Sequence, residues 1–130
     1  MPARLSRGEP EFYNLRISER AAREVTVIFV RLSELVSDIY AIGWDTSLRL
    51  AISSLATNPR RCSLAPEPFK REVRHLIFPR SGSRRTYRIL FTISDEEAHS
   101  IESPTVTVLF VRAAVSPIKR SLLRDIESLD

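Results

Sequence analysis

The sequence contains a single cysteine, Cys62, so it cannot form an internal disulfide and has no Cys-x-x-Cys motif. A lone thiol is typical of proteins in a reducing compartment, and we expect a cytoplasmic location. The two histidines have no cysteine or cluster of carboxylates close by in the sequence to complete a metal site. We therefore expect no metal and no cofactor.

Long apolar runs are absent as well. No run approaches the ~20 residues that a helix needs to span a bilayer. Residues 1–15 (MPARLSRGEPEFYNL) lack the apolar segment of a secretory signal. A chain of 130 residues has the size of one domain with one core. The sequence thus predicts a single domain over residues 1–130, without a membrane segment.

Positive charge is concentrated in one part of the chain. Residues 58–88 contain nine basic and two acidic residues, a net charge of +7, whereas the whole chain carries +4. The other 99 residues therefore sum to −3. A localised positive field attracts polyanions or an acidic protein partner. The alternative is a solvated loop and strand edge, where arginines prevent pairing between sheet edges.

A short strand and a long helix are expected first. Residues 11–18 (EFYNLRIS) alternate in polarity as a strand does. Ser18 is placed to cap the helix, and apolar residues then recur every three or four positions on one face as far as Ile39. Gly43 is expected to break this helix.

A second helix is expected directly after the break. Trp44 should pack between the two helices, and Asp45 or Thr46 should cap the second one. Asn58 precedes a proline, which disfavours the helical conformation, so the second helix should end there. Such a short connection folds the two helices back on each other as an αα-hairpin.

Three strands are expected after a loop over residues 59–72. They are residues 73–78 (VRHLIF), 84–94 (RRTYRILFTIS) and 105–112 (TVTVLFVR), which are rich in β-branched and aromatic residues. Residues 116–129 are expected to form a last helix. The order β-α-α-β-β-β-α predicts an α+β fold, in which a small, twisted, mostly antiparallel sheet carries the helical hairpin on one face.

The alternation of side chains along the second of these strands places Arg88. Tyr87, Ile89, Phe91 and Ile93 share the face that should meet the helices, and Arg88 lies on the other face. A buried arginine needs a carboxylate partner, and neither flanking strand contains an acidic residue. We therefore expect Arg88 to project from an open face of the sheet towards a ligand.

The order of these segments resembles a known family. A strand, a helical hairpin ending in LATNPRR (residues 55–61), a basic loop, and the strands VRHLIF, YRILFTISD and VTVLFVRAAV are similar to the RelE/ParE superfamily of toxins from bacterial type II toxin–antitoxin systems. The resemblance covers residues 12–115. Its most specific parts are Leu55 with Asn58 and Pro59, and the strands at residues 87–91 and 108–112.

The resemblance implies one fold with two activities. RelE-like toxins cut mRNA in the ribosomal A site without a metal, and ParE-like toxins inhibit DNA gyrase and cut nothing. In both groups, which include plasmid stabilisation proteins, a companion antitoxin binds and neutralises the toxin. We expect ribosome-dependent mRNA cleavage, with a gyrase inhibitor or a non-toxic RNA-binding adaptor as the alternatives.

The resemblance also implies candidate site residues. Attack of a ribose 2′-OH on the adjacent phosphate needs cations on the phosphate oxygens and groups that move protons. Arg74, Arg88 and Arg112 match or lie near the basic residues of the family's strands. His75 is the candidate acid or base, because its ordinary pKa suits that task. Further RNA contacts are expected from the basic residues of the loop and the following turn: Lys70, Arg71, Arg80, Arg84 and Arg85.

The sequence departs from the RelE pattern after Arg112. The segment AAVSPIKRSLL has no tyrosine, so the tyrosine that RelE-like toxins often carry near the C-terminus is missing. Strand alternation puts Tyr87 on the face of the sheet away from Arg88, and His75 on the face away from Arg74. The residues therefore do not supply a complete acid–base set, and a His75 that merely fills a half-buried position is the alternative.

Overall fold

The computed structural model describes residues 10–78, 86–94 and 104–114. The expected order of elements is confirmed as far as the last strand. The expected helix at residues 116–129 lies outside the described residues. The main elements are β1 (Asn14–Ile17), α1 (Glu19–Leu35), α2 (Asp38–Ser53), β2 (Arg74–Phe78), β3 (Tyr87–Ser94) and β4 (Thr105–Ala113), with the short 3-10 helices η1 (Ser54–Ala56) and η2 (Pro59–Arg61) between α2 and β2.

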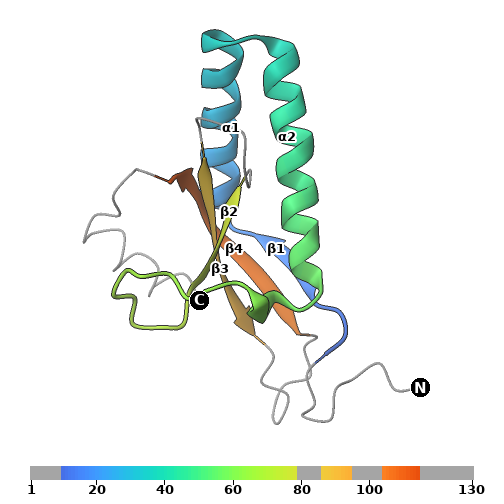
Figure 1. Ribbon diagram of the computed structural model, residues 1–130, viewed down its shortest axis with the longest axis vertical. Helices are drawn as coiled ribbons and strands as arrows, with labels where there is room; N and C mark the ends of the chain where they lie inside the picture. The colour runs from blue at the N-terminus through green and yellow to red at the C-terminus, as the bar shows by residue number, and fades with distance from the viewer. Residues whose placement is uncertain (1–9, 79–85, 95–103, 115–130) are drawn as a thin grey trace.

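The four strands form one sheet in the order β1-β4-β3-β2 (Figure 1). β1 is parallel to β4, whereas β4–β3 and β3–β2 are antiparallel pairs. The pairing of β3 with β4 shifts register between Leu90 and Phe91, where a β-bulge interrupts the ladder. The expected α+β fold with a mostly antiparallel sheet is thus confirmed.

The main core lies between the sheet and the helical hairpin. Ile89 and Phe91 of β3 are fully buried there, beside Val106 and Val108 of β4. The helices contribute a matching set of buried side chains: Ala21, Leu32, Ala41, Trp44, Leu48, Ile52. The expectation that this face of β3 meets the helices is confirmed. Each large aliphatic side chain buried there stabilises the fold by about 1.5–3 kcal/mol.

The boundary between the two helices differs from the expected one. α1 ends at Leu35, and Ser37 caps α2 by accepting a hydrogen bond from the backbone N–H of Tyr40 (3.0 Å). The side chain of Ser33 also donates to the carboxylate of Asp38 across the turn. This capping chemistry starts α2 well before Gly43, which lies inside the helix with open space where a side chain would begin. The expected break at Gly43, and the caps at Asp45 or Thr46, are therefore wrong.

Two consequences follow from the early turn. Trp44 does not lie at the helix junction but packs from α2 onto the sheet side, with ring centroids 5.4 Å from Tyr87 and 6.4 Å from Phe78. Leu35, the last residue of α1, and Ile39, which already belongs to α2, were expected on one buried stripe but are exposed. Figure 1 shows both helices side by side, extending beyond the strands.

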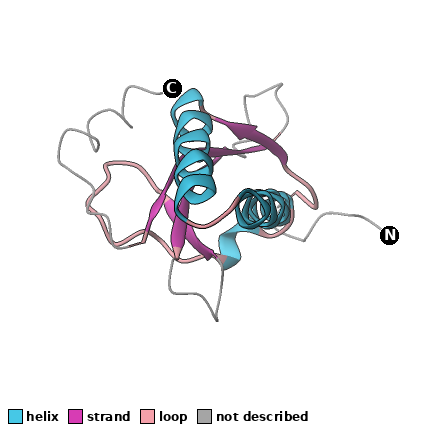
Figure 2. Ribbon diagram, turned by 90° about the horizontal axis from the view of Figure 1, so that it is seen from above, coloured by secondary structure: helices cyan, strands magenta, loops and turns pink. Residues whose placement is uncertain are grey.

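The opposite face of the sheet is covered and not open. Leu90, Leu109 and Phe110 form a second, smaller cluster with Val73, against which Ala65 and Phe69 are packed. Both of the latter belong to residues 62–73, the covering loop. Figure 2 shows this loop and α2 on opposite sides of the strands. The expectation of an open sheet face is wrong, because strand alternation assigns a side chain to a face but says nothing of what covers it.

The start of α1 is fixed to the edge of β4. The backbone N–H of Ser18 donates to the carbonyl of Val108 (2.9 Å), and its hydroxyl donates to the carbonyl of Leu109 (3.0 Å). The same hydroxyl oxygen accepts from the N–H of Ala21 and caps α1, as expected (3.0 Å). Further along β4, a carboxylate oxygen of Glu24 accepts from the N–H of Val111 (2.8 Å).

Candidate functional site

Arg88 lies in the middle of β3 and is 7% exposed. Its Nη1 and Nη2 donate to the two carboxylate oxygens of Glu67, at 2.6 and 2.8 Å. This is the parallel, two-bond geometry that an arginine fork gives to a carboxylate or a phosphate. The expectation that Arg88 projects into solvent is wrong: the carboxylate it needs comes from the covering loop and not from a neighbouring strand.

His75 completes a group that we call the Arg88 cluster, consisting of Arg88, Glu67 and His75. The imidazole lies on the same face as Arg88, because His75 pairs with Leu90 and Ile77 pairs with Arg88 in the β2–β3 register. The Nε–H of Arg88 donates to Nδ1 of His75 (3.1 Å). A neutral imidazole offers one acceptor nitrogen, so this bond holds His75 in its neutral form with the proton on Nε2.

The pKa shifts in the cluster follow from these contacts. The hydrogen bonds from Arg88 lower the pKa of Glu67 below its ordinary value, against the effect of its burial. Burial, followed by the nearby charge of Arg88, lowers the pKa of His75. The geometry therefore holds an ionised carboxylate and a neutral imidazole beside one guanidinium.

The covering loop presents Glu67 in a restricted conformation. Glu67 stands between Pro66 and Pro68, and a residue before proline is confined to extended conformations. The carbonyl of Glu67 accepts from the N–H of Phe69 (2.8 Å), which closes a tight turn around Pro68. Within the loop, Ala65 N–H donates to the carbonyl of Val73, and the loop is tied to β2 because His75 N–H donates to the carbonyl of Ser63.

Arg74 lies on the other face of β2 and serves a different purpose. Its Nη1 donates to the carbonyls of Cys62 (2.6 Å) and Arg60 (3.3 Å), and its Nε and Nη2 contact Glu72, both at 2.8 Å. These bonds attach the beginning of the covering loop to the strand. Burial raises the pKa of the neighbouring Cys62 thiol, so Cys62 stays protonated and has little nucleophilic character. The expected separation of His75 from Arg74 is seen.

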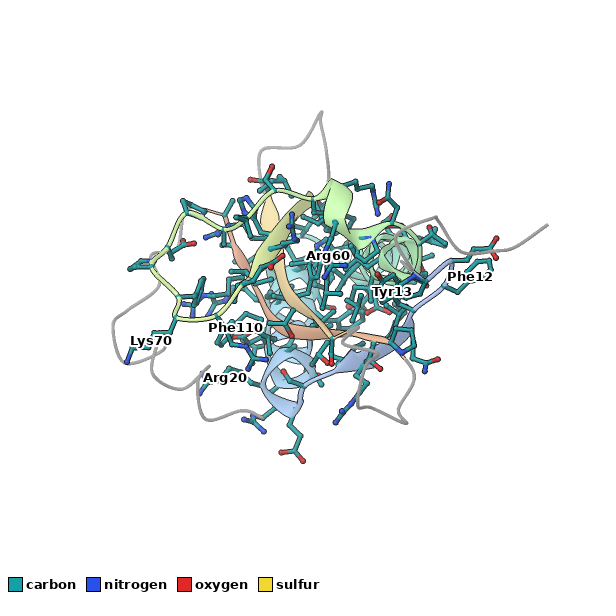
Figure 3. All side chains as sticks on the ribbon, turned by 90° about the horizontal axis from the view of Figure 1, so that it is seen from below. Phe12, Tyr13, Arg20, Arg60, Lys70 and Phe110 are labelled. Carbon is teal, nitrogen blue, oxygen red and sulfur yellow. The ribbon has the colours of Figure 1, made fainter. Side chains whose placement is uncertain are left out.

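Arg112 is half-buried near the end of β4 and pairs in register with Arg88. The two arginines lie on neighbouring strands, and Arg88 has the carboxylate of Glu67 beside it. Arg20 adds another cation near this face, with its guanidinium carbon 5.5 Å from the centroid of the Phe110 ring (Figure 3). Burial raises the pKa of Glu24, against the opposing effects of the hydrogen bond from Val111 and the nearby charges of Arg112 and Arg20.

The remaining expected RNA contacts are only partly described. Lys70 is exposed on the covering loop, away from Phe110 in Figure 3, and Arg71 is half-buried. Arg80, Arg84 and Arg85 lie outside the described residues. Another basic residue of the stretch has a structural contact: Nη1 of Arg61 donates to the carbonyls of Ser54, Thr57 and Asn58, in the segment that follows α2. α2 itself ends at Ser53, before the expected end at Asn58.

The candidate catalytic residues therefore do not converge on one accessible surface. Arg88 and His75 are together but covered, Arg112 is beside them, and Arg74 is on the opposite face. Sequence reasoning missed Glu67, the residue that organises the cluster. Its only signal is an acidic residue between two prolines inside a strongly basic stretch.

Two further findings concern other kinds of site. Within residues 10–78, 86–94 and 104–114, no group of three or more histidine, cysteine or carboxylate side chains is placed to hold a metal ion. The described helices include none that is both long and apolar enough to cross a membrane.

Comparison with known proteins gives a structural relative. No protein-family model matches the sequence. No curated protein matches it either. A solved chain described as the "Chromosomal ParDE TA system from P. aeruginosa" has a similar structure, with a TM-score of 0.58, 14% sequence identity, and an alignment that covers 79% of this chain and 97% of that chain. At this identity the likeness is one of fold, and the chain has a RelE/ParE-like fold.

Proposed function

We propose that this protein is the toxin of a type II toxin–antitoxin pair. The support is the whole element order from β1 to β4 on a sheet with one parallel and two antiparallel pairings. The similar solved chain belongs to a toxin–antitoxin system and is matched over nearly its full length. Because a fold does not by itself specify an activity, the target must be argued from the site.

The Arg88 cluster favours a toxin that acts by binding, as the ParE-like gyrase inhibitors do. A ribonuclease needs cations that reach the phosphate of its substrate. Arg88 is 7% exposed and its fork is filled by Glu67, while Arg74 is bonded to the loop that it anchors. This closed arrangement is the observation that carries the proposal.

Ribosome-dependent mRNA cleavage is the second candidate. One observation favours it: Nδ1 of His75 lies 3.1 Å from Nε of Arg88, and Arg112 pairs in register beside them. If the covering loop moved away, an arginine pair and an imidazole would share one face. A general base and a phosphate cradle would then be adjacent, although the sequence still lacks the C-terminal tyrosine of RelE-like toxins.

The proposed partner is an antitoxin that covers the outer face of α2. Ile39, Ile42 and Leu50 lie on that face and are 83%, 57% and 68% exposed. Gly43 and Thr46 lie between them, and the ion pair of Arg49 with Asp45 borders this face beside Ile42. An uncovered apolar helix face of this kind is typical of a protein interface. Substituting Ile39 and Leu50 by serine should weaken antitoxin binding without unfolding the toxin.

Two assays on one purified preparation test the proposal. A supercoiling assay with DNA gyrase should show inhibition, and primer extension on a defined mRNA in a translating extract should show no codon-positioned cuts. The reverse result would establish the ribonuclease candidate. If the protein neither inhibits gyrase nor cuts mRNA, but binds nucleic acid in a way that weakens steeply with salt, it is the non-toxic RNA-binding adaptor.

A further inference from the structure

The end of the helical hairpin carries a group of exposed apolar side chains. They belong to the last residue of α1, the residue that caps it, and the first turn of α2. We call them the tip patch: Leu35, Val36, Ile39 and Tyr40, which are 62%, 47%, 83% and 42% exposed. Single exposed apolar residues are ordinary, but four large ones within six consecutive residues indicate an interaction surface.

The length of the hairpin explains why the tip patch is exposed. The apolar stripe of α1 is buried at Leu32 and exposed one turn later at Leu35. Figure 1 shows that both helices continue past the strands at this end, so the last turn of α1 has run beyond the sheet. The core does not use the apolar side chains of this turn, and polar residues would form the same helices. Packing within the fold therefore does not account for their apolar character.

The charged residues beside the tip patch are mainly acidic. Residues 31–40 contain one basic residue, Arg31, and two acidic residues, Glu34 and Asp38, a net charge of −1 in a chain that carries +4. Both acidic residues are exposed, and the hydroxyl of Ser33 donates to the carboxylate of Asp38 at the turn. This end of the molecule repels phosphates and anionic lipid headgroups. Its charge complements a protein surface that carries basic residues.

The shape of the tip restricts the partner further. Two helices joined by a tight turn form a narrow convex projection (Figure 1). A convex apolar surface is removed from water on several sides at once only when it enters a concave site. Tyr40 contributes an aromatic ring with a polar hydroxyl, and tyrosine is enriched among the residues that dominate the energy of protein interfaces.

We propose that the tip patch is the surface by which this protein docks onto its protein target, and that the target offers an apolar recess rimmed by basic residues. The inference rests on the proposed function, in which the toxin acts by binding. Ile39 also belongs to the outer face of α2 that we assign to the antitoxin. The two surfaces therefore meet at Ile39, and an occupant of one excludes the other there.

The test compares two double variants of the purified protein, with purified DNA gyrase as the probe. Leu35→Ser/Val36→Ser removes two side chains of the tip patch. Ile42→Ser/Leu50→Ser is the matched control, because it replaces two similarly exposed apolar side chains on the same hairpin but outside the tip patch. Supercoiling inhibition and direct binding to gyrase are both measured. Thermal unfolding, followed by the fluorescence of the single tryptophan, verifies that each variant is folded.

We expect Leu35→Ser/Val36→Ser to need a roughly tenfold or greater concentration for half-maximal inhibition, since truncating interface anchors weakens binding by at least this factor. The control pair should inhibit as the wild type does. Glu34→Lys keeps every apolar side chain of the tip patch and changes only the charge beside it. It should weaken binding to gyrase, and the difference from the wild type should shrink as salt is added.

The outcomes separate this inference from the proposed function. A wild type that leaves supercoiling unaffected contradicts the proposed function, and this inference with it. Inhibition by Leu35→Ser/Val36→Ser equal to that by the wild type, or an equal loss in both double variants, overturns this inference alone. Tighter binding of Glu34→Lys would contradict the basic rim of the target.

Two other occupants of the tip patch give distinct results, and either would overturn the inference. Wild-type protein that binds vesicles of phosphatidylcholine and phosphatidylglycerol, while Leu35→Ser/Val36→Ser does not bind them but still inhibits gyrase, would assign the tip to a membrane surface. A wild-type dimer that this variant converts into a monomer with full inhibition of gyrase would assign the tip to a second copy of the chain.

Discussion

Glu67 and Arg88 are 21 residues apart in the chain, and their side chains join the covering loop to the middle of β3 with bonds of 2.6 and 2.8 Å. The pair neutralises a guanidinium that the sheet would otherwise bury without a counter-ion. Removing one member of a buried pair costs about 3–5 kcal/mol, because the other charge stays behind. We place Glu67→Gln at the lower end of that range, since the carboxylate is still 20% exposed.

The pH dependence of that contribution follows from the lowered pKa of Glu67. A carboxyl group with a pKa below its ordinary value of 4.5 stabilises the folded state above this pH, and the contribution disappears as the pH falls through the lowered pKa. The difference in unfolding free energy between wild type and Glu67→Gln should therefore shrink in acid. Urea unfolding at a series of pH values measures it, and a difference that stays constant below pH 4.5 would contradict the assignment.

His75 should affect the stability of the fold at a higher pH than Glu67 does. Its pKa is lowered from 6.5, so the unfolded chain takes up a proton before the folded protein does. Stability should consequently fall as the pH decreases below 6.5, towards the lowered pKa of the folded state. His75→Asn should remove this part of the acid sensitivity while the part due to Glu67 persists. Identical pH profiles for His75→Asn and wild type would rule out the neutral, hydrogen-bonded imidazole.

Two serine caps offer a matched comparison. Ser18 and Ser37 each cap a helix, but only Ser18 also donates to the sheet, at the carbonyl of Leu109. Loss of a cap costs about 0.5–2 kcal/mol, and loss of a further hydrogen bond adds about 0.5–1.5 kcal/mol. Ser18→Ala should therefore destabilise the protein more than Ser37→Ala in chemical denaturation. Equal losses would mean that the bond to β4 contributes nothing to stability.

Two variants of Glu24 distinguish the contribution of its hydrogen bond to stability from the contribution of its charge. Its carboxylate accepts from the buried Val111 N–H, yet burial raises its pKa, so the ionised form is disfavoured in the folded state. Glu24→Ala leaves that N–H without an acceptor and should cost about 1–3 kcal/mol. Glu24→Gln keeps an acceptor oxygen and should be close to neutral near pH 7. A loss as large in Glu24→Gln as in Glu24→Ala would show that the charge, acting on Arg112 or Arg20, is what matters.

The secondary structure could largely be predicted from local patterns. The alternation in residues 73–78, 84–94 and 105–112 located the three long strands, and it also placed Ile89 and Phe91 in the core. The helix boundary was predicted wrongly because two signals competed. A glycine weakens a helix by about 0.5–1 kcal/mol but does not end it, whereas the cap at Ser37 and the contact from Ser33 to Asp38 define a new start.

The candidate site was less predictable, because it depends on tertiary contacts. Alternation put Arg88 and His75 on definite faces, and the structure has them there. No local pattern reports that the 62–73 loop folds back over that face through Ala65 and Phe69, or that it delivers Glu67 to the guanidinium. The count of charges in the sequence could not show which arginines are available to a ligand. Arg61, Arg74 and Arg88 each donate hydrogen bonds to carbonyl or carboxylate oxygens of the same chain.

Growth of bacteria after induced expression of this chain tests the central claim, that it is a toxin, most directly. The induced cells should stop dividing, and co-expression of an antitoxin that binds the protein should restore growth. Trp44 fluorescence of the purified product verifies that the protein is folded. Unimpaired growth with abundant, folded protein and no antitoxin present would contradict the proposal and leave a RelE/ParE-like fold without toxic activity.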